Sequence, residues 1–75
     1  MEMSDVVINR EPVELFKVLK FEGLVGSGGE AKLVIGNGLV QLNGKVETQK
    51  RKKVVSGDVI EFNDAQMTLV LEPST

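Results

Sequence analysis

The chain has 75 residues and a net charge of -2, and 41% of its residues are hydrophobic, with three Phe but neither Trp nor Tyr. This length allows one domain, spanning residues 1–75, with a small aliphatic core. Cys and His are both absent from the sequence, which excludes disulfides, thiolate metal sites and the commonest general base. We therefore expect neither a bound metal nor a cofactor.

Targeting and membrane signals are also missing from the sequence. No stretch approaches the roughly 18 apolar residues of a membrane span. The N-terminal sequence MEMSDVV lacks the basic and long apolar regions of a signal peptide. We expect a cytoplasmic, soluble monomer that does not bind membranes.

The charges are distributed unevenly along the chain. Residues 45–53 hold five basic side chains and one carboxylate, a local charge of +4, so the remainder of the chain carries -6. A basic patch on an acidic body attracts a polyanion to one side and repels it elsewhere. The pattern therefore favours docking of a polyanion in a defined orientation.

The N-terminal part of the sequence predicts a strand followed by a helix. The β-branched run Val6-Val7-Ile8 within residues 3–9 predicts an edge strand. Glu11-Pro12 is typical of a helix opening with Pro12 at the first helical position, and Gly23 is the expected end. The apolar face of this helix consists of Val13, Leu15, Phe16, Val18 and Leu19.

A second helix is predicted to begin near Ser27 and to end near Gly36. Ser27 and Glu30 have the S-x-x-E spacing of a capping box, in which the Ser hydroxyl accepts from the Glu backbone N–H and the Glu carboxylate accepts from the Ser amide. Ala31, Val34 and Ile35 then form one apolar stripe. The sequence Gly36-Asn37-Gly38 tolerates the left-handed conformation that ends a helix.

A hairpin is predicted to follow this helix. Residues 39–42 form its first strand, and Asn43-Gly44 is the preferred dipeptide of a two-residue type I′ turn, in which both residues have positive φ. Residues 45–48 are expected to pair back on the first strand. Residues 49–53 then begin a basic loop.

The C-terminal part predicts two more strands, at residues 59–62 and 67–71, joined by a turn at Asn63-Asp64. Residues 72–75 are polar and are expected to be frayed. The expected fold is α+β, with two short helices packed on one side of a small, mainly antiparallel sheet of about four to five strands.

These features together form a composite pattern: the capped helix start, G-x-V-x-L-N-G over residues 38–44, and G-D-x-I over residues 57–60. The matching positions are Leu19, Lys20, Gly23, Leu24, Ser27, Gly28, Glu30, Ala31, Lys32, Ile35, Gly38, Val40, Leu42, Asn43, Gly44, Lys53, Gly57, Asp58 and Ile60. The pattern resembles the S4 RNA-binding domain, also called the αL motif, from about Val13 to Phe62, and the chain length is similar to that of small stand-alone bacterial members.

The resemblance implies binding of structured RNA, which could be rRNA, tRNA or a small RNA, with the ribosome as one possible partner. The second helix and the loop after the hairpin would face the RNA. Many family members carry an Arg directly after the Ser, whereas Gly28 and Gly29 stand here. The expected RNA contacts are Lys20, Ser27, Gly28, Gly29, Lys32, Asn43, Lys45, Lys50, Arg51, Lys52 and Lys53.

Each of these contacts has a purely structural alternative. Gly28 and Gly29 either offer free N–H groups to a phosphate or only ease a tight turn before the helix. Lys20 and Lys32 either contact RNA or are simply solvated. The run of four cations from Lys50 either reads phosphates or protects an edge strand from unwanted pairing. Asn43 is first a turn residue and only then an RNA contact.

The sequence is compatible with two classes of function. The first is recognition of RNA through phosphate and shape, because the three Phe residues fall in core-like patterns and leave little for stacking on bases. The second is a protein-interaction module whose acidic body docks on a basic partner, for example a ribosomal protein. Catalysis is disfavoured because eleven dispersed carboxylates offer no nucleophile, base or oxyanion arrangement, and no phosphate-binding loop accompanies the glycines.

Overall fold

The computed structural model describes residues 2–73, so Met1 and the predicted frayed end at Ser74 and Thr75 lie outside the described residues. Within that range the chain forms two helices and seven strands. In order these are β1 (Glu2–Ile8), β2 (Val13–Glu14), α1 (Leu15–Phe21), α2 (Gly28–Gly36), β3 (Gln41–Leu42), β4 (Lys45–Val46), β5 (Lys53–Val54), β6 (Val59–Phe62) and β7 (Ala65–Leu71).

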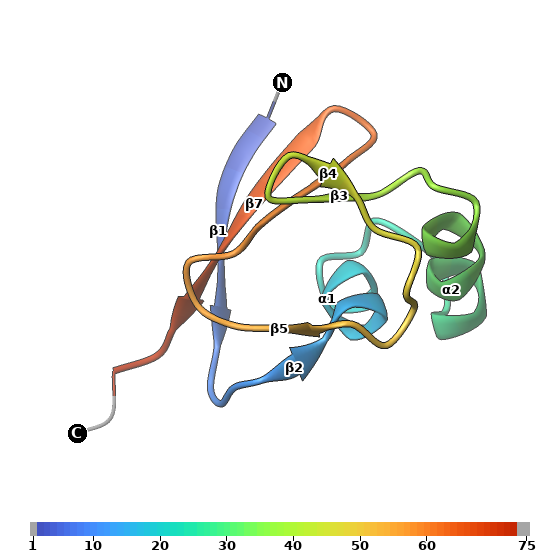
Figure 1. Ribbon diagram of the computed structural model, residues 1–75. Helices are drawn as coiled ribbons and strands as arrows, with labels where there is room; N and C mark the ends of the chain where they lie inside the picture. The colour runs from blue at the N-terminus through green and yellow to red at the C-terminus, as the bar shows by residue number, and fades with distance from the viewer. Residues whose placement is uncertain (1, 74–75) are drawn as a thin grey trace.

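The main sheet has five strands in the order β1-β7-β6-β3-β4 (Figure 1). β1 is an edge strand, as predicted, and it pairs in parallel with β7, whereas the other neighbours in this sheet are antiparallel. Asn43-Gly44 closes the β3–β4 hairpin with φ values of 53° and 84°, and Asn63-Asp64 closes the β6–β7 hairpin with φ values of 53° and 66°. Positive φ at both central residues is what a type I′ turn requires. Both predicted turns are confirmed, although β3 and β4 are only two residues long.

A second, two-stranded sheet corrects the predicted start of the first helix. Val13 and Glu14 are extended and pair with Val54 and Lys53, so that β2 and β5 form an antiparallel ladder. Pro12 is therefore not the first helical residue, and α1 begins at Leu15. The predicted end is confirmed, because Gly23 follows the C-terminus of α1 with φ of 70°. This small sheet holds the N-terminus of α1 beside Lys53, the last residue of the predicted basic loop.

The core lies between the helices and one face of the main sheet. α1 contributes Leu15, Val18 and Leu19, and α2 contributes Ala31 and Ile35, all fully buried. The sheet contributes alternating residues, namely Val6, Ile8, Ile60, Phe62, Met67 and Leu69. The two helices pack against each other, and α2 lies at the opposite end of the molecule from β1 (Figure 1). The predicted α+β arrangement is confirmed. Neither helix within residues 2–73 has the length and apolar content needed to cross a bilayer.

Candidate nucleic-acid interface

The start of α2 is capped as the sequence predicts. Ser27 is extended, with φ of -161° and ψ of 166°, and its Oγ accepts a hydrogen bond from the Glu30 backbone N–H at 3.1 Å. This bond satisfies one of the N–H groups that have no partner inside the helix. Among residues 2–73, the Glu30 carboxylate makes no return bond to Ser27, and its Oε2 lies beside Gly26 instead. Half of the predicted capping box is therefore formed.

The backbone of the basic loop caps the start of α1. Because Lys53 lies in β5, the basic loop spans residues 49–52 in the structure. Glu14 is the N-cap residue of α1, and its side chain makes no capping bond. Instead, the Leu15 N–H donates to the Lys52 carbonyl at 2.9 Å, and the Phe16 N–H donates to the Lys50 carbonyl at 3.2 Å. The loop backbone is thus fixed to a helix, while the side chains of Lys50 and Arg51 are exposed. A cationic surface on an immobilised backbone loses less conformational entropy when it binds.

The half-buried ring of Phe16 is the point where three segments of the chain meet. Lys32 Nζ of α2 lies 4.7 Å from the ring centroid, Arg51 Cζ of the basic loop 5.7 Å and Lys17 Nζ of α1 5.9 Å. These distances are within the range of cation–π attraction. A Cβ placed on Gly28 would lie 3.7 Å from Phe16 Cε2, so the start of α2 also borders the ring. We call Phe16 with Lys17, Lys32 and Arg51 the Phe16 cluster.

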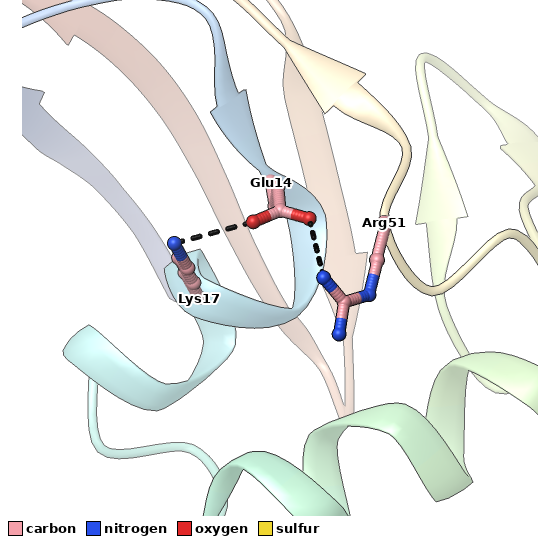
Figure 2. Close-up of polar contacts among 3 residues, drawn as sticks. All are labelled: Glu14, Lys17 and Arg51. Atoms are coloured by element: carbon pink, nitrogen blue, oxygen red, sulfur yellow. Dashed lines mark ion pairs between the residues drawn. The ribbon is translucent and has the colours of Figure 1, made fainter.

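The Glu14 carboxylate lies within this basic surface. The Oε1 of Glu14 lies 3.2 Å from Lys17 Nζ, and its Oε2 lies 3.6 Å from Arg51 Nη1 (Figure 2). The Glu14 side chain is 16% exposed. The hydrogen bond from Lys17 lowers the pKa of the Glu14 carboxyl below its ordinary value. Burial raises this pKa, whereas the positive charges of Lys17, Arg51 and Lys53 lower it further. Glu14 therefore holds two members of the Phe16 cluster in place.

Sequence reasoning missed Phe16, Lys17 and Glu14 as parts of the site. The apolar and polar spacing places Phe16 on the buried face of the first helix, and Lys17 and Glu14 on its polar side. The one signal in the sequence is the i, i+3 spacing of Glu14 and Lys17, which places a carboxylate and an ammonium group on the same side of a helix, next to Phe16. These three residues become part of a cationic cluster only because Lys32 and Arg51, from distant parts of the chain, lie over the Phe16 ring.

The remaining predicted contacts lie in different surroundings. The Lys50 side chain passes over the C-terminus of α2, where a Cβ on Gly36 would lie 3.2 Å from Lys50 Cε. Lys52 is half-buried, and Lys53 lies in β5 opposite Glu14. Lys20 is exposed near the end of α1. Lys20 and Lys53 line one surface cleft together with Phe16, whereas Lys50 reaches the C-terminus of α2.

The predicted contacts in the hairpin are separate from that surface. Lys45 is exposed in β4, and no ion pair or hydrogen bond within residues 2–73 joins it to the Phe16 cluster. The side chain of Asn43 serves the scaffold, because its Oδ1 accepts from the Val59 N–H at 2.8 Å and its Nδ2 donates to Asp58 Oδ1 at 3.1 Å. The structure thus gives Asn43 a structural role beyond its turn conformation.

The expectation that all three Phe residues belong to the core is wrong. Phe62 is buried and Phe16 is half-buried, but Phe21 is 71% exposed. Phe21 is the last residue of α1, and the apolar stripe of the helix has already ended at Leu19. An aromatic ring is therefore available on the surface.

Comparison with known proteins agrees with this architecture. The family model of the S4 domain matches residues 6–70. The chain belongs to the S4 domain family. A solved structure similar to this chain is that of YbcJ from Escherichia coli, which is described as revealing an αL motif involved in RNA binding. It has a TM-score of 0.70 and 38% identity, and the match covers 93% of this chain and 90% of that one.

Two proteins with similar sequences are also named YbcJ. "Putative RNA-binding protein YbcJ" of Escherichia coli strain K12 is 43% identical over 61 residues, which cover 80% of this chain and 87% of the relative. "Uncharacterized protein YbcJ" of Shigella flexneri has the same identity and coverage. The resemblance of the sequence to a small bacterial S4 domain with an αL motif is therefore confirmed.

Proposed function

We propose that this chain binds structured RNA through phosphate and shape contacts and does no chemistry on it. The observation that carries the proposal is the Phe16 cluster, in which cations from α1, α2 and the basic loop lie within 5.9 Å of one ring centroid. These cations are separated by up to 34 positions in the sequence, from Lys17 to Arg51. A fold that gathers them beside one helix start concentrates positive potential on one side of an acidic chain.

The phosphate-contacting face consists of the start of α2 at Gly28 and Gly29 together with Lys32, Lys50, Arg51, Lys52 and Lys53. Gly28 borders the same ring as Lys32 and Arg51. These two cations therefore place positive charge next to the position where many family members have an Arg. They supply the charge that the glycine at position 28 lacks, and the helix N–H groups add donors for phosphate oxygens.

The rival function, docking of the acidic body on a basic protein, makes a different prediction about which surface matters. RNA binding depends on the cations, and salt weakens it strongly because each neutralised phosphate releases counterions. With about four phosphates neutralised, the logarithm of affinity falls with the logarithm of salt at a slope of about -3 to -4. If the chain instead docks on a protein through its acidic body, substitutions in the basic loop should leave its affinity for RNA unchanged.

The test is RNA binding by the double variant Lys50→Gln/Arg51→Gln, titrated between 50 and 200 mM salt with a structured RNA. Neutral Gln is chosen because a carboxylate at position 51 would face Glu14, which lies 3.6 Å from Arg51. The expected result is weaker binding to every structured RNA and a slope flatter by about 1.5, since phosphate contacts do not read sequence.

The matched control is Met3→Glu/Val70→Glu, which makes the same change in net charge on the exposed outer face of β1 and β7. It should retain the affinity and slope of the parent. If the loop variant stays folded and binds RNA with unchanged affinity and slope, the phosphate-contacting face is wrongly assigned, and the acidic body becomes the surface to test.

A further inference from the structure

An open cleft of about 720 Å³ lies between the β1–β2 connection and α1. Its volume is in the range of about 300–1,000 Å³ that is typical of small-molecule sites. The residues that matter for its chemistry are Arg10, Pro12, Val13, Lys20, Phe21 and Lys53. The cleft therefore combines an apolar wall with several cations.

The aromatic wall of the cleft is Phe21. Its side chain is 71% exposed at the C-terminal end of α1. Pro12 and Val13 supply further apolar surface on the same cleft. A nucleobase can stack on an exposed aromatic ring whatever its identity, because every base has a π-face.

The charge of the cleft complements a phosphate. Arg10, Lys20 and Lys53 line it and are exposed. Glu14 also lines it, but this carboxylate is already paired with Lys17 at 3.2 Å and with Arg51. Because the anion is neutralised and the cations remain, the cleft fits a ligand that carries both a planar ring and a negative charge.

The cleft is continuous with the phosphate-contacting face. Phe16, the centre of the Phe16 cluster, lines the cleft as well, and Lys53 belongs to both surfaces. An RNA backbone that lies along the basic loop therefore passes the mouth of the cleft. This continuity favours a nucleotide over an unrelated acidic ligand.

We infer that the cleft receives one unpaired nucleotide of the bound RNA, with its base stacked on Phe21 and its phosphate held by Arg10, Lys20 and Lys53. This inference rests on the proposed function, because the nucleotide is part of the RNA that the phosphate-contacting face holds. It adds recognition of an unpaired position to the contacts with paired RNA.

The experiment compares three RNAs: a blunt duplex, the same duplex with one bulged uridine, and the bulged duplex with an abasic residue at that position. The wild-type chain should bind the bulged uridine about tenfold more tightly than the other two, since stacking on one aromatic ring supplies this much. Phe21→Ala should lose the preference and bind the blunt duplex as the parent does. Phe21→Trp should retain the preference.

The matched control is Met3→Ala, which truncates another exposed apolar side chain, 74% exposed, on β1. It should leave all three affinities unchanged. A second measurement follows the Phe21 ring by NMR while uridine monophosphate is added, and the ring signals should shift in the parent.

The outcomes separate the two proposals. If none of the three RNAs is bound with a salt-dependent affinity, the proposed function fails and the cleft assignment fails with it. If the blunt duplex is bound but the bulged uridine is not preferred, or if Phe21→Ala keeps the preference, only the cleft assignment is overturned. It is also overturned if a glutamate-rich peptide shifts the Phe21 ring signals and uridine monophosphate does not.

Discussion

Asn43 and Asp58 join two motifs of the sequence, G-x-V-x-L-N-G and G-D-x-I, through one hydrogen bond, from Asn43 Nδ2 to Asp58 Oδ1 at 3.1 Å. Each side chain also accepts a hydrogen bond from a backbone N–H. Asn43 Oδ1 accepts from the Val59 N–H at 2.8 Å, and Asp58 Oδ2 accepts from the Val55 N–H at 2.9 Å. The Asn of the L-N-G turn and the Asp of the G-D-x-I segment thus form one polar unit. This unit fastens the β3–β4 hairpin to the start of β6.

The first prediction exchanges the two side chains of this unit. Asn43→Asp alone places two carboxylates next to each other and should lower the free energy of unfolding by on the order of 1–3 kcal/mol. Asp58→Asn alone opposes two amide groups and should also destabilise. The double variant Asn43→Asp/Asp58→Asn restores a donor on one side and an acceptor on the other, so its melting temperature should recover toward that of the parent.

Thermal unfolding of the four proteins measures the coupling between the two positions. Strictly additive losses in the double variant would mean that this hydrogen bond does not hold the two motifs together. A positive φ of 53° at position 43 is tolerated by both Asn and Asp, so the exchange tests the bond and not the turn.

The second prediction concerns the cap of α2. Ser27→Ala removes the acceptor of the 3.1 Å bond from the Glu30 N–H and should cost about 1 kcal/mol. In a domain of this size, the melting temperature should fall by roughly 4–8 °C. Ser4→Ala, at an exposed position of β1, is the control and should melt like the parent. Equal melting temperatures for both variants would refute the capping role of Ser27.

The third prediction concerns pH. The hydrogen bond from Lys17 lowers the pKa of Glu14 in the folded chain, so the folded state favours the ionised carboxylate. This contribution to stability is present above the pKa of Glu14 in the unfolded chain, about 4.3, and is lost as the pH falls through the lower pKa of the folded chain. Glu14→Gln should therefore be less stable than the parent at pH 7, and the difference should shrink in acid.

Urea unfolding of the parent and Glu14→Gln between pH 7 and pH 3 measures this difference. Glu72→Gln, an exposed carboxylate at the end of β7, controls for the loss of one charge. A stability difference between the parent and Glu14→Gln that is the same at both ends of the pH range would show that the ion pairs of Glu14 do not stabilise the fold.

The fourth prediction introduces the Arg that many S4 domains carry. A Cβ at position 28 would lie 3.7 Å from the Phe16 ring, which is ordinary van der Waals contact, so Gly28→Arg should fold. The variant should bind structured RNA more tightly, with a salt slope steeper by about 0.7–0.9 if one more phosphate is neutralised. Gly28→Gln is the matched control, because it removes the same glycine without adding charge. Equal RNA affinities for the two variants would place position 28 outside the phosphate-contacting face.

The elements that were predictable from the sequence depend on residues close to one another in the chain. The Ser27 cap acts over three positions, the Asn43-Gly44 turn needs only two residues of positive φ, and Gly23 ends α1 by its own conformation. Short segments are enough to produce these features because capping hydrogen bonds and backbone sterics act between residues that are close in the sequence. The composite spacing of these signals is enough to recognise the S4 family without the tertiary contacts.

The tertiary structure decided the features that depend on contacts between distant segments. Pro12 has the sequence context of a helix start, but pairing of Val13 and Glu14 with β5 moves the start to Leu15. The Phe16 ring is the centre of a cationic cluster because Arg51 of the basic loop and Lys32 of α2 both lie over it. No local sequence pattern predicts contacts between segments so far apart in the chain. Phe21 is exposed because it lies beyond Leu19, where the packing of α1 against the core ends. Burial and electrostatics are properties of the assembled surface, and only the assembled fold determines them.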